Sequence, residues 1–186
     1  LGEPLSNRRI DRVPDTPLPT GVERLTDLDD ASPYAVYWEA LKAEGRLLAD
    51  RSPAMQRWRL ADPDLPRAPL MLAYRHEGKI TGHAAAMVVK INPLDPPVLE
   101  ILDLEALDGD KRAIPALMQA LRTLARPMGA AKLRIQFVSP RLLERLGVHA
   151  EQARAEGGWG HAHAAFAADA PDQSLWSPTP YDGDYA

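Results

Sequence analysis

The sequence predicts an α+β domain in which a mixed, mostly antiparallel sheet is flanked by helices. Three segments carry this prediction. In residues 112–126 the apolar side chains recur at the spacing of one helical face. Residues 132–138 alternate between apolar and polar side chains, which is typical of a strand with one buried face. Residues 70–90 fit two strands joined by a tight turn, where Gly78 can supply a positive φ.

The other elements follow from capping and turn residues. Ser32-Pro33 and Ser52-Pro53 each combine a good helix N-cap with a proline at the first helical position. Gly82, inside the second strand of the hairpin, predicts a bulge or a close approach of another backbone. The expected strands are residues 21–27, 70–74, 79–90, 98–104, 132–138, 149–156 and 159–168, and the expected helices are 33–44, 53–61, 112–126 and 140–145.

Composition and charge exclude several classes of protein. The 186-residue chain has no cysteine, which excludes a disulfide framework, a thiolate nucleophile and a cysteine zinc site. Its longest run without a polar residue, 84–89, is too short to span a membrane. The net charge of −4 argues against a nucleic-acid partner. No signal peptide is visible after Leu1-Gly2, so a cytoplasmic location is expected.

Three regions are expected along the chain. Residues 1–20 are rich in proline and predict an extended arm or linker. Residues 21–170 form the domain. Residues 171–186 form a tail with several prolines and aspartates and no basic residue, in which Trp176, Tyr181 and Tyr185 offer side chains for docking.

The segment 102–113 is the most informative for function, because a strand ends there and a helix begins after a short turn. The first turn of a helix has unbonded amides and a partial positive charge, so it can hold an anion such as phosphate. Lys111 and Arg112 add formal positive charge at this point. The alternative is a helix capped by Asp108 or Asp110, with the two basic side chains in solvent.

Two carboxylates lie at the end of the strand that precedes this turn. Asp103 and Glu105 are two residues apart, so they share one face of the strand. A carboxylate in a partly dry cleft has a raised pKa, which suits a general base. The alternative is a solvated strand end with no catalytic role.

The histidines are expected to have structural roles. His161 and His163 share a strand face, but no third ligand with suitable spacing is near, so no metal site is expected. His83 lies on an apolar strand and is expected to be a hydrogen-bonded core histidine.

The order of the expected elements resembles that of the GNAT superfamily of acyl-CoA-dependent N-acyltransferases. Residues 73–84 look like the strand-turn-strand of that family, 98–126 stand in the place of its cofactor-binding segment, and 146–148 look like its Leu-Gly-Phe ending. More narrowly, residues 51–59 and 176–185 resemble bacterial GNAT-like proteins related to the FemAB group. In some of these, two GNAT halves are joined.

This resemblance implies that acetyl-CoA or another acyl-CoA binds where the third and fourth core strands separate. It implies that backbone near Leu104 pairs with the pantetheine arm and that the following amides hold the pyrophosphate. A substrate amine would attack the thioester directly, with Glu105 as the nearest carboxylate and Asp103 as the second candidate base. The implied cofactor contacts are Leu104, Ala106, Gly109, Asp110, Lys111, Arg112 and Ala113.

The sequence departs from the family pattern at two places. The loop 107–113 has one glycine, where the family usually has Gln/Arg-x-x-Gly-x-Gly/Ala. Leu143 stands where many members carry a tyrosine that protonates the leaving thiolate.

Two main functional hypotheses follow. The first is an acyl-CoA-dependent N-acyltransferase acting on an amine of a small molecule or peptide. The second is a non-catalytic GNAT-fold module, either half of a tandem protein or a ligand- or partner-binding domain, and an unrelated α+β binding domain is a third. A homodimer, or pairing with a second GNAT-like half, is a possible assembly; no nucleic-acid or membrane partner is expected.

Overall fold

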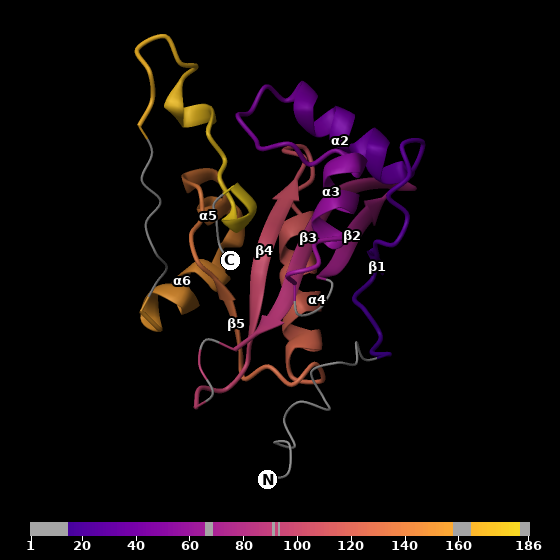
Figure 1. Ribbon diagram of the computed structural model, residues 1–186, viewed down its shortest axis with the longest axis vertical. Helices are drawn as coiled ribbons and strands as arrows, with labels where there is room; N and C mark the ends of the chain where they lie inside the picture. The colour runs from indigo at the N-terminus through magenta and orange to yellow at the C-terminus, as the bar shows by residue number, and fades with distance from the viewer. Residues whose placement is uncertain (1–14, 66–68, 91, 93, 158–164, 183–186) are drawn as a thin grey trace.

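A computed structural model describes residues 15–65, 69–90, 92, 94–157 and 165–182. Its centre is a five-stranded sheet (Figure 1). The strands β1 to β5 lie side by side in chain order, the first four antiparallel and β5 parallel to β4. The sheet is therefore mixed and mostly antiparallel, as predicted. The strands are β1 (Val22–Arg24), β2 (Leu70–His76), β3 (Lys79–Val89), β4 (Val98–Ala106) and β5 (Lys132–Ile135).

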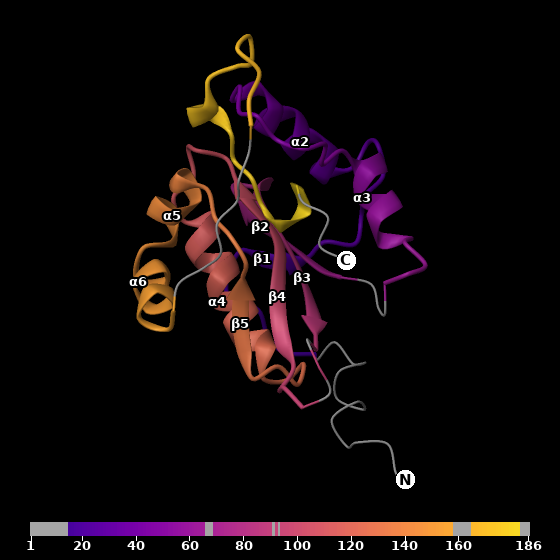
Figure 2. The same ribbon diagram turned by 60° about the vertical axis from the view of Figure 1, so that its left-hand side comes forward.

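Helices cover both faces of this sheet (Figure 2). Helices α2 (Pro33–Ala43) and α3 (Pro53–Leu60) lie on one face, and α4 (Ala113–Ala125) packs on the other. Helices α5 (Pro140–Leu146) and α6 (Val148–Ala155) follow β5. Two 3₁₀ turns, η1 (Gln173–Leu175) and η2 (Pro180–Asp182), belong to the C-terminal segment.

Strand alternation divides the buried side chains between two cores. Leu72 and Ala84 face α4, whereas their neighbours Met71 and Ala85 face α2. The α4 side is the larger core and contains the apolar stripe of that helix. The functional residues described below lie on the α2 side.

The serine caps predicted at Ser32 and Ser52 are present, and Ser139 forms a third cap of the same kind. Ser32, Ser52 and Ser139 each accept a hydrogen bond from the backbone amide three residues later, and each is followed by proline. Satisfying an otherwise unbonded amide stabilises each helix start. These caps fix where α2, α3 and α5 begin.

Gly82 lies where β3, β4 and α4 come closest. A Cβ atom at this position would be 2.9 Å from the Cβ atoms of both Ala106 and Ala113. The close approach predicted from Gly82 is therefore confirmed, and it lets the start of α4 rest directly on the sheet.

The C-terminal part of the domain differs from expectation. Residues 149–156 were expected to form a strand, but Val148–Ala155 is helix α6. The segment is rich in Ala, Glu, Gln and Arg, which favour a helix, and the flanking Gly147 and Gly157 end it without forming a hairpin. Strand β5 ends at Ile135, earlier than 138. Of the strand expected at 159–168, residues 159–164 lie outside the described residues and 165–168 are not in a strand.

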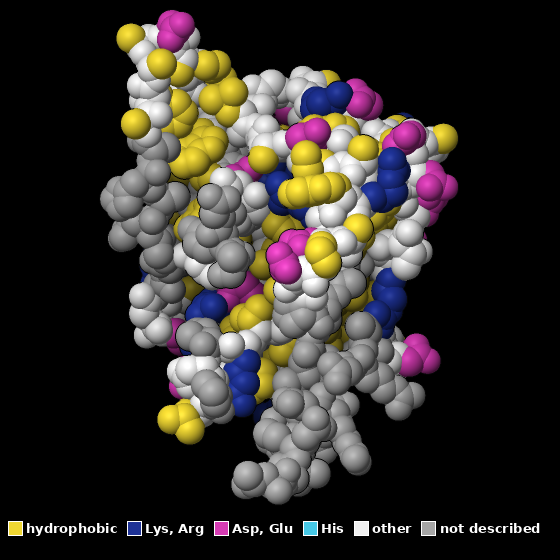
Figure 3. Space-filling model, viewed as in Figure 1, with side chains coloured by type: hydrophobic (Ala, Val, Ile, Leu, Met, Phe, Trp, Pro, Cys, Tyr) yellow, Lys and Arg dark blue, Asp and Glu magenta, His cyan; other side chains and the backbone are white. Residues whose placement is uncertain are grey.

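Acidic and basic side chains are interspersed over the face shown in Figure 3. Within the described part of the chain, every helix is too short or too polar to cross a bilayer. The same residues hold no group of three or more side chains that could bind a metal ion. His161 and His163 lie outside them.

Candidate functional site

Strands β4 and β5 separate halfway along β4. The parallel pairing covers only Val98 to Ile101 of β4, opposite Lys132 to Ile135. Beyond this point β4 continues to Ala106, paired on its other side with β3. Among the described strands, none covers this half of β4 on the β5 side. One edge of β4 is thus left without a strand partner.

The C-terminal segment lies across the region where the two strands separate, between α5 and β4 (Figures 1 and 2). It is fixed to the segment after α2 by a short parallel bridge between Leu47 and Trp176. The Leu47 amide donates to Leu175 O at 2.9 Å, and the Ser177 amide donates to Leu47 O at 3.1 Å. This pairing brings the residues after Trp176 over the side chains of β4.

Asp103 is the centre of a buried hydrogen-bond network and has no exposed surface. Its carboxylate accepts from Arg51 Nε at 2.9 and 3.1 Å, from Thr179 Oγ1 at 2.9 Å and contacts His83 Nε2 at 2.9 Å. Burial opposes ionisation of Asp103, but Arg51 and His83 outweigh it and hold its pKa well below the usual range. Asp103 is therefore an ion-pair partner at neutral pH.

Arg51 connects the sheet to the C-terminal segment. Its guanidinium is fully buried and pairs with Asp103 on one side and with Asp182 at 2.9 Å on the other. It also donates to Thr179 Oγ1 and to Ala49 O, each at 2.9 Å. A planar group with several donors can satisfy all these acceptors at once.

Glu105 has a second buried arginine as its partner. Arg46 Nη1 lies 2.7 Å from its carboxylate, and Ser177 Oγ donates to the other oxygen at 3.0 Å. Burial raises the pKa of Glu105, and the nearby guanidinium of Arg46 only partly offsets this. The pKa values of the two predicted carboxylates are thus shifted in opposite directions.

His83 and Tyr37 extend the network under α2. Tyr37 Oη lies 3.1 Å from His83 Nδ1 and 3.1 Å from Glu105 O. Because ionised Asp103 can only accept, Nε2 of His83 carries the proton that it shares with Asp103. His83 is a hydrogen-bonded core histidine, as expected, and it couples Asp103 to Tyr37.

The turn between β4 and α4 is closed by the chain's own groups. The amide of Asp108 donates to Glu44 Oε1 at 2.7 Å, and that of Asp110 donates to Leu107 O at 3.2 Å. The Arg112 amide donates to Asp110 Oδ1 at 3.0 Å. Two of the amides expected to hold an anion, those of Asp110 and Arg112, are therefore already bonded.

The basic side chains of this turn point to solvent, whereas its carbonyls are covered. Lys111 and Arg112 are exposed, and Arg112 Nε lies 3.2 Å from Asp110. Arg145 of α5 donates to the carbonyls of Ala106 and Asp110 at 2.7 and 2.8 Å. These are the features of the second alternative considered for this turn: an acidic side chain bonds a backbone amide, and the two basic side chains lie in solvent.

The remaining predicted cofactor contacts lie along the same stretch of chain. The side chains of Leu104, Ala106 and Ala113 are buried in the α4 core, so only their backbone could face a ligand. Gly109 has open space around its Cα. Leu143 is partly buried against the same core.

Sequence reasoning missed the partners of the two carboxylates. Arg46 and Arg51 lie in the connection between α2 and α3, where no periodic pattern marks a residue as buried. Tyr37 lies on the buried face of α2, and that position alone does not reveal its contact with His83. The one feature of the sequence that could have drawn attention to Arg51 is its position immediately before the capped helix α3.

Comparison with solved structures shows which fold this is. The ribosomal-protein-alanine N-acetyltransferase of Brucella melitensis biovar Abortus 2308 superposes with a TM-score of 0.52 at 21% identity, over 78% of this chain and 99% of that one. Glucosamine-6-phosphate N-acetyltransferase from Arabidopsis thaliana gives a TM-score of 0.50 at 14% identity, over 80% and 97%. No protein-family model and no curated protein matches the sequence. The chain therefore has the GNAT acetyltransferase fold.

Proposed function

We propose that this chain is an acyl-CoA-dependent N-acyltransferase acting on an amine of a small molecule or a peptide. The observation that carries the proposal is the separation of β4 from β5 after Ile101, which leaves one backbone edge of β4 without a strand partner. An extended pantetheine arm could form hydrogen bonds along that edge, as a neighbouring strand would. The two solved structures named above are acetyltransferases, one named for ribosomal-protein alanine and the other for an amino sugar phosphate.

The residues present fit an acyl-CoA in part. The edge of β4 that lacks a strand partner suits the arm, although the C-terminal segment lies across this region and Arg145 bonds the carbonyl of Ala106. The exposed cations Lys111 and Arg112 suit its phosphates. The turn offers fewer amides than a glycine-rich loop, because those of Asp108, Asp110 and Arg112 are bonded. Phosphate binding would thus depend more on side-chain charge than on backbone amides.

In this proposal Glu105 accepts the proton that the amine loses. The acyl-CoA supplies a thioester carbonyl carbon, to which the amine nitrogen bonds as the carbon–sulfur bond breaks and the thiolate leaves. Glu105 suits the proton transfer because burial raises its pKa, which brings a carboxylate nearer to neutral pH. Asp103, whose pKa is low, instead orients His83 and holds Arg51.

A non-catalytic module is the second candidate, and a specific observation favours it. Asp103 and Glu105 are each ion-paired with a buried arginine, and the C-terminal segment covers both. A buried ion pair with this many partners can serve stability or specificity alone. In that case the fold would bind a ligand or partner without transferring an acyl group.

Binding of acetyl-CoA, measured by calorimetry, separates these candidates. The double variant Lys111→Gln/Arg112→Gln is expected to bind about tenfold more weakly, from the loss of two partly exposed charge contacts. The matched control is Arg122→Gln/Arg126→Gln, which removes two exposed charges near the other end of α4 and is expected to bind as the unmodified protein does. No binding at millimolar acetyl-CoA would reject the acyltransferase and favour the non-catalytic module.

Turnover tests the role of Glu105. The chain has no cysteine, so a thiol reagent detects released CoA without any background from the protein. Glucosamine-6-phosphate and a peptide with N-terminal alanine are suitable first acceptors. Glu105→Gln is expected to bind acetyl-CoA normally and to lose at least about 100-fold in rate, the usual contribution of a general base. An undiminished rate would exclude Glu105 as the base.

Several finer points stay predictions. These are the relationship to the FemAB group, the cytoplasmic location, and assembly as a homodimer or with a second GNAT-like half. The division of the chain into an arm at 1–20, a domain at 21–170 and a tail at 171–186 also stays a prediction.

A further inference from the structure

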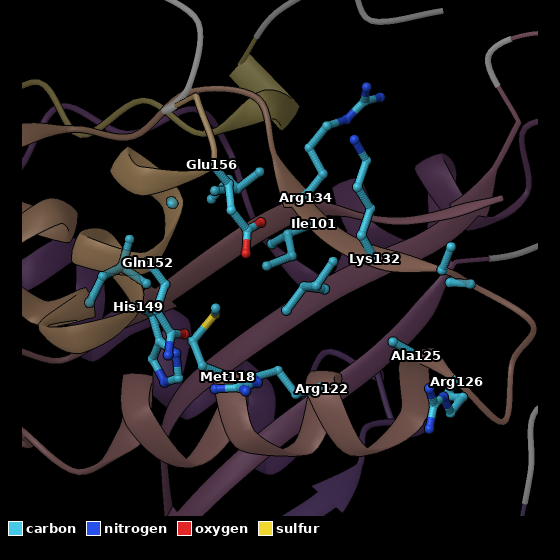
Figure 4. A pocket seen from close by; sticks show the side chains of 16 residues that line it. Ile101, Met118, Arg122, Ala125, Arg126, Lys132, Arg134, His149, Gln152 and Glu156 are labelled. Carbon is cyan, nitrogen blue, oxygen red and sulfur yellow. The ribbon is translucent and has the colours of Figure 1, made fainter. Parts of the chain in front are cut away.

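A second site is indicated on the opposite side of the sheet from Asp103 and Glu105. A cavity of about 650 Å³ lies between α4, β5 and α6 (Figure 4). This volume is within the usual range for small-molecule sites. We propose that this cavity binds an organic anion with an apolar body, such as a medium-chain carboxylate or phosphate ester.

The cavity is separate from the proposed acyl-CoA site. On α4 it is lined by residues from Met118 to Arg126, whereas the turn with Lys111 and Arg112 precedes the start of that helix. Arg122 lies eleven positions after Lys111, and most of that interval is helix, which rises about 1.5 Å per residue. The two residues therefore lie well apart along the axis of α4. The proposal does not depend on the acyltransferase being correct.

The charge around the cavity is unlike that of the chain as a whole. Two cations of α4, Arg122 and Arg126, line it with one carboxylate, Glu156, whereas Lys132 and Arg134 border it from β5 with side chains that point away from α4 (Figure 4). The whole chain carries a net charge of −4, so this is a local reversal of sign. Such a concentration of one sign attracts ligands of the opposite charge.

Three of these cations have no ion-pair partner among the described residues. Arg134 Nε pairs with Glu100 at 2.5 Å. Arg122, Arg126 and Lys132 form no salt bridge within the described part of the chain, and all three side chains are exposed. Arg122 and Arg126, which lie on α4, are therefore available to an anion in the cavity without first breaking a contact.

The floor of the cavity is apolar. Ile101 lies on it between the strands and α4, as Figure 4 shows, and Met118 approaches from α4. Leu133, Ile135 and Leu146 complete this lining. Because apolar surface favours a ligand that removes it from water, a hydrated inorganic anion would use only part of the site.

His149 provides an internal reporter of an anion in this cavity. It lines the cavity from α6. Its pKa is lowered by burial and, to a smaller extent, by the charge of Arg122, whereas a hydrogen bond with Gln152 acts to raise it. The other charged lining groups are Arg126 on α4, Lys132 and Arg134 on β5, and Glu156 on α6. An anion close to Arg122 would offset its charge, so the pKa of His149 should rise when the site is filled.

Decanoate and decyl phosphate are the probes, and decyltrimethylammonium is the control of equal chain length and opposite charge. Calorimetry is expected to show binding of at least one anion and none of the cation. Arg122→Gln/Arg126→Gln should weaken anion binding about tenfold. The charge-matched control Lys111→Gln/Arg112→Gln should leave it unchanged. Acetyl-CoA is expected not to compete.

The result is decisive in either direction. Thermal unfolding first shows that both double variants fold, and proton NMR then follows the titration of His149 with and without decanoate. Weaker binding in the Arg122/Arg126 variant together with a raised pKa of His149 supports the site. Absence of anion binding at millimolar concentration, equal binding of the cation, or an unaffected Arg122/Arg126 variant overturns it. None of these outcomes depends on transferase activity.

Discussion

Replacing Arg51 with methionine tests whether buried charge holds the C-terminal segment on the sheet. The change removes a guanidinium with no exposed surface and leaves an apolar side chain of similar length. Asp103, fully buried, loses the Nε donor shared by both of its carboxylate oxygens, and Asp182, which is 10% exposed, loses its ion pair. Thr179 and the carbonyl of Ala49 each lose a donor as well.

The expected loss is large compared with the stability of a domain. Removing one partner of a buried ion pair typically costs about 3–5 kcal/mol, because the other charge stays buried. Total stabilities are about 5–15 kcal/mol, so Arg51→Met should still fold but unfold at much lower urea concentration. The matched control is Arg57→Met, whose pair with Asp30 is exposed and should contribute about 0–1 kcal/mol.

The pH dependence follows from the direction of the pKa shift. Asp103 has a lowered pKa when folded, so its contribution is fully present above the unfolded value of about 3.9 and is lost as pH falls through the folded value. Without Arg51, burial dominates and the pKa of Asp103 should rise above 3.9. The difference in unfolding free energy between Arg51→Met and the unmodified protein should then be largest at pH 7 and shrink toward pH 4.

Urea unfolding at pH 7, 5 and 4, followed by circular dichroism, measures that difference. A loss below about 1 kcal/mol at pH 7, equal to that of Arg57→Met, would refute the reasoning. A loss that does not depend on pH would show that packing, and not the charge of Asp103, causes the effect.

Two further predictions concern packing and hydrogen bonding at the same sheet. Gly82→Ala should lower the free energy of unfolding by about 1–3 kcal/mol, because the added Cβ would lie 2.9 Å from the Cβ of Ala106. The control is Gly109→Ala, whose added Cβ would meet no atom within 4 Å and should cost far less stability. Urea midpoints of the two variants check this, and equal midpoints would contradict it. Ser177→Ala should cost about 0.5–1.5 kcal/mol and raise the pKa of Glu105 further, since a donated hydrogen bond is lost. Carboxylate NMR titration measures that shift, and an unchanged or lower pKa would count against the contact.

The elements that sequence predicted well are those with local causes. Helix α4 follows from its own apolar periodicity, and the starts of α2 and α3 follow from a serine-proline pair at each. The strand period also placed Asp103 and Glu105 on one face, where the structure has both. Each of these conclusions needs only a few neighbouring residues.

The parts that sequence could not predict depend on distant contacts. Arg51 is 52 residues from Asp103 and 131 from Asp182, and nothing local distinguishes it from a solvated arginine. Helix α6 was missed because the sequence pair Gly157-Gly158 suggested a turn between two strands, whereas the residues of α6 themselves favour a helix. Pairing over such separations is set by the tertiary fold, which no window of sequence contains.

The docking of the C-terminal segment has a consequence for how the chain folds during synthesis. Arg51 and Asp103 can meet once β4 has been made, but Thr179 and Asp182 reach them only after nearly all of the described chain has left the ribosome. Contacts between residues so far apart are entropically costly and form late. Until then Asp103 and Glu105 of β4 lack the hydrogen bonds that the C-terminal segment supplies, and such incompletely folded surface is the kind that chaperones bind and on which aggregates form. The slowest step in folding this domain should therefore be the closing of its last described turn, η2, over β4.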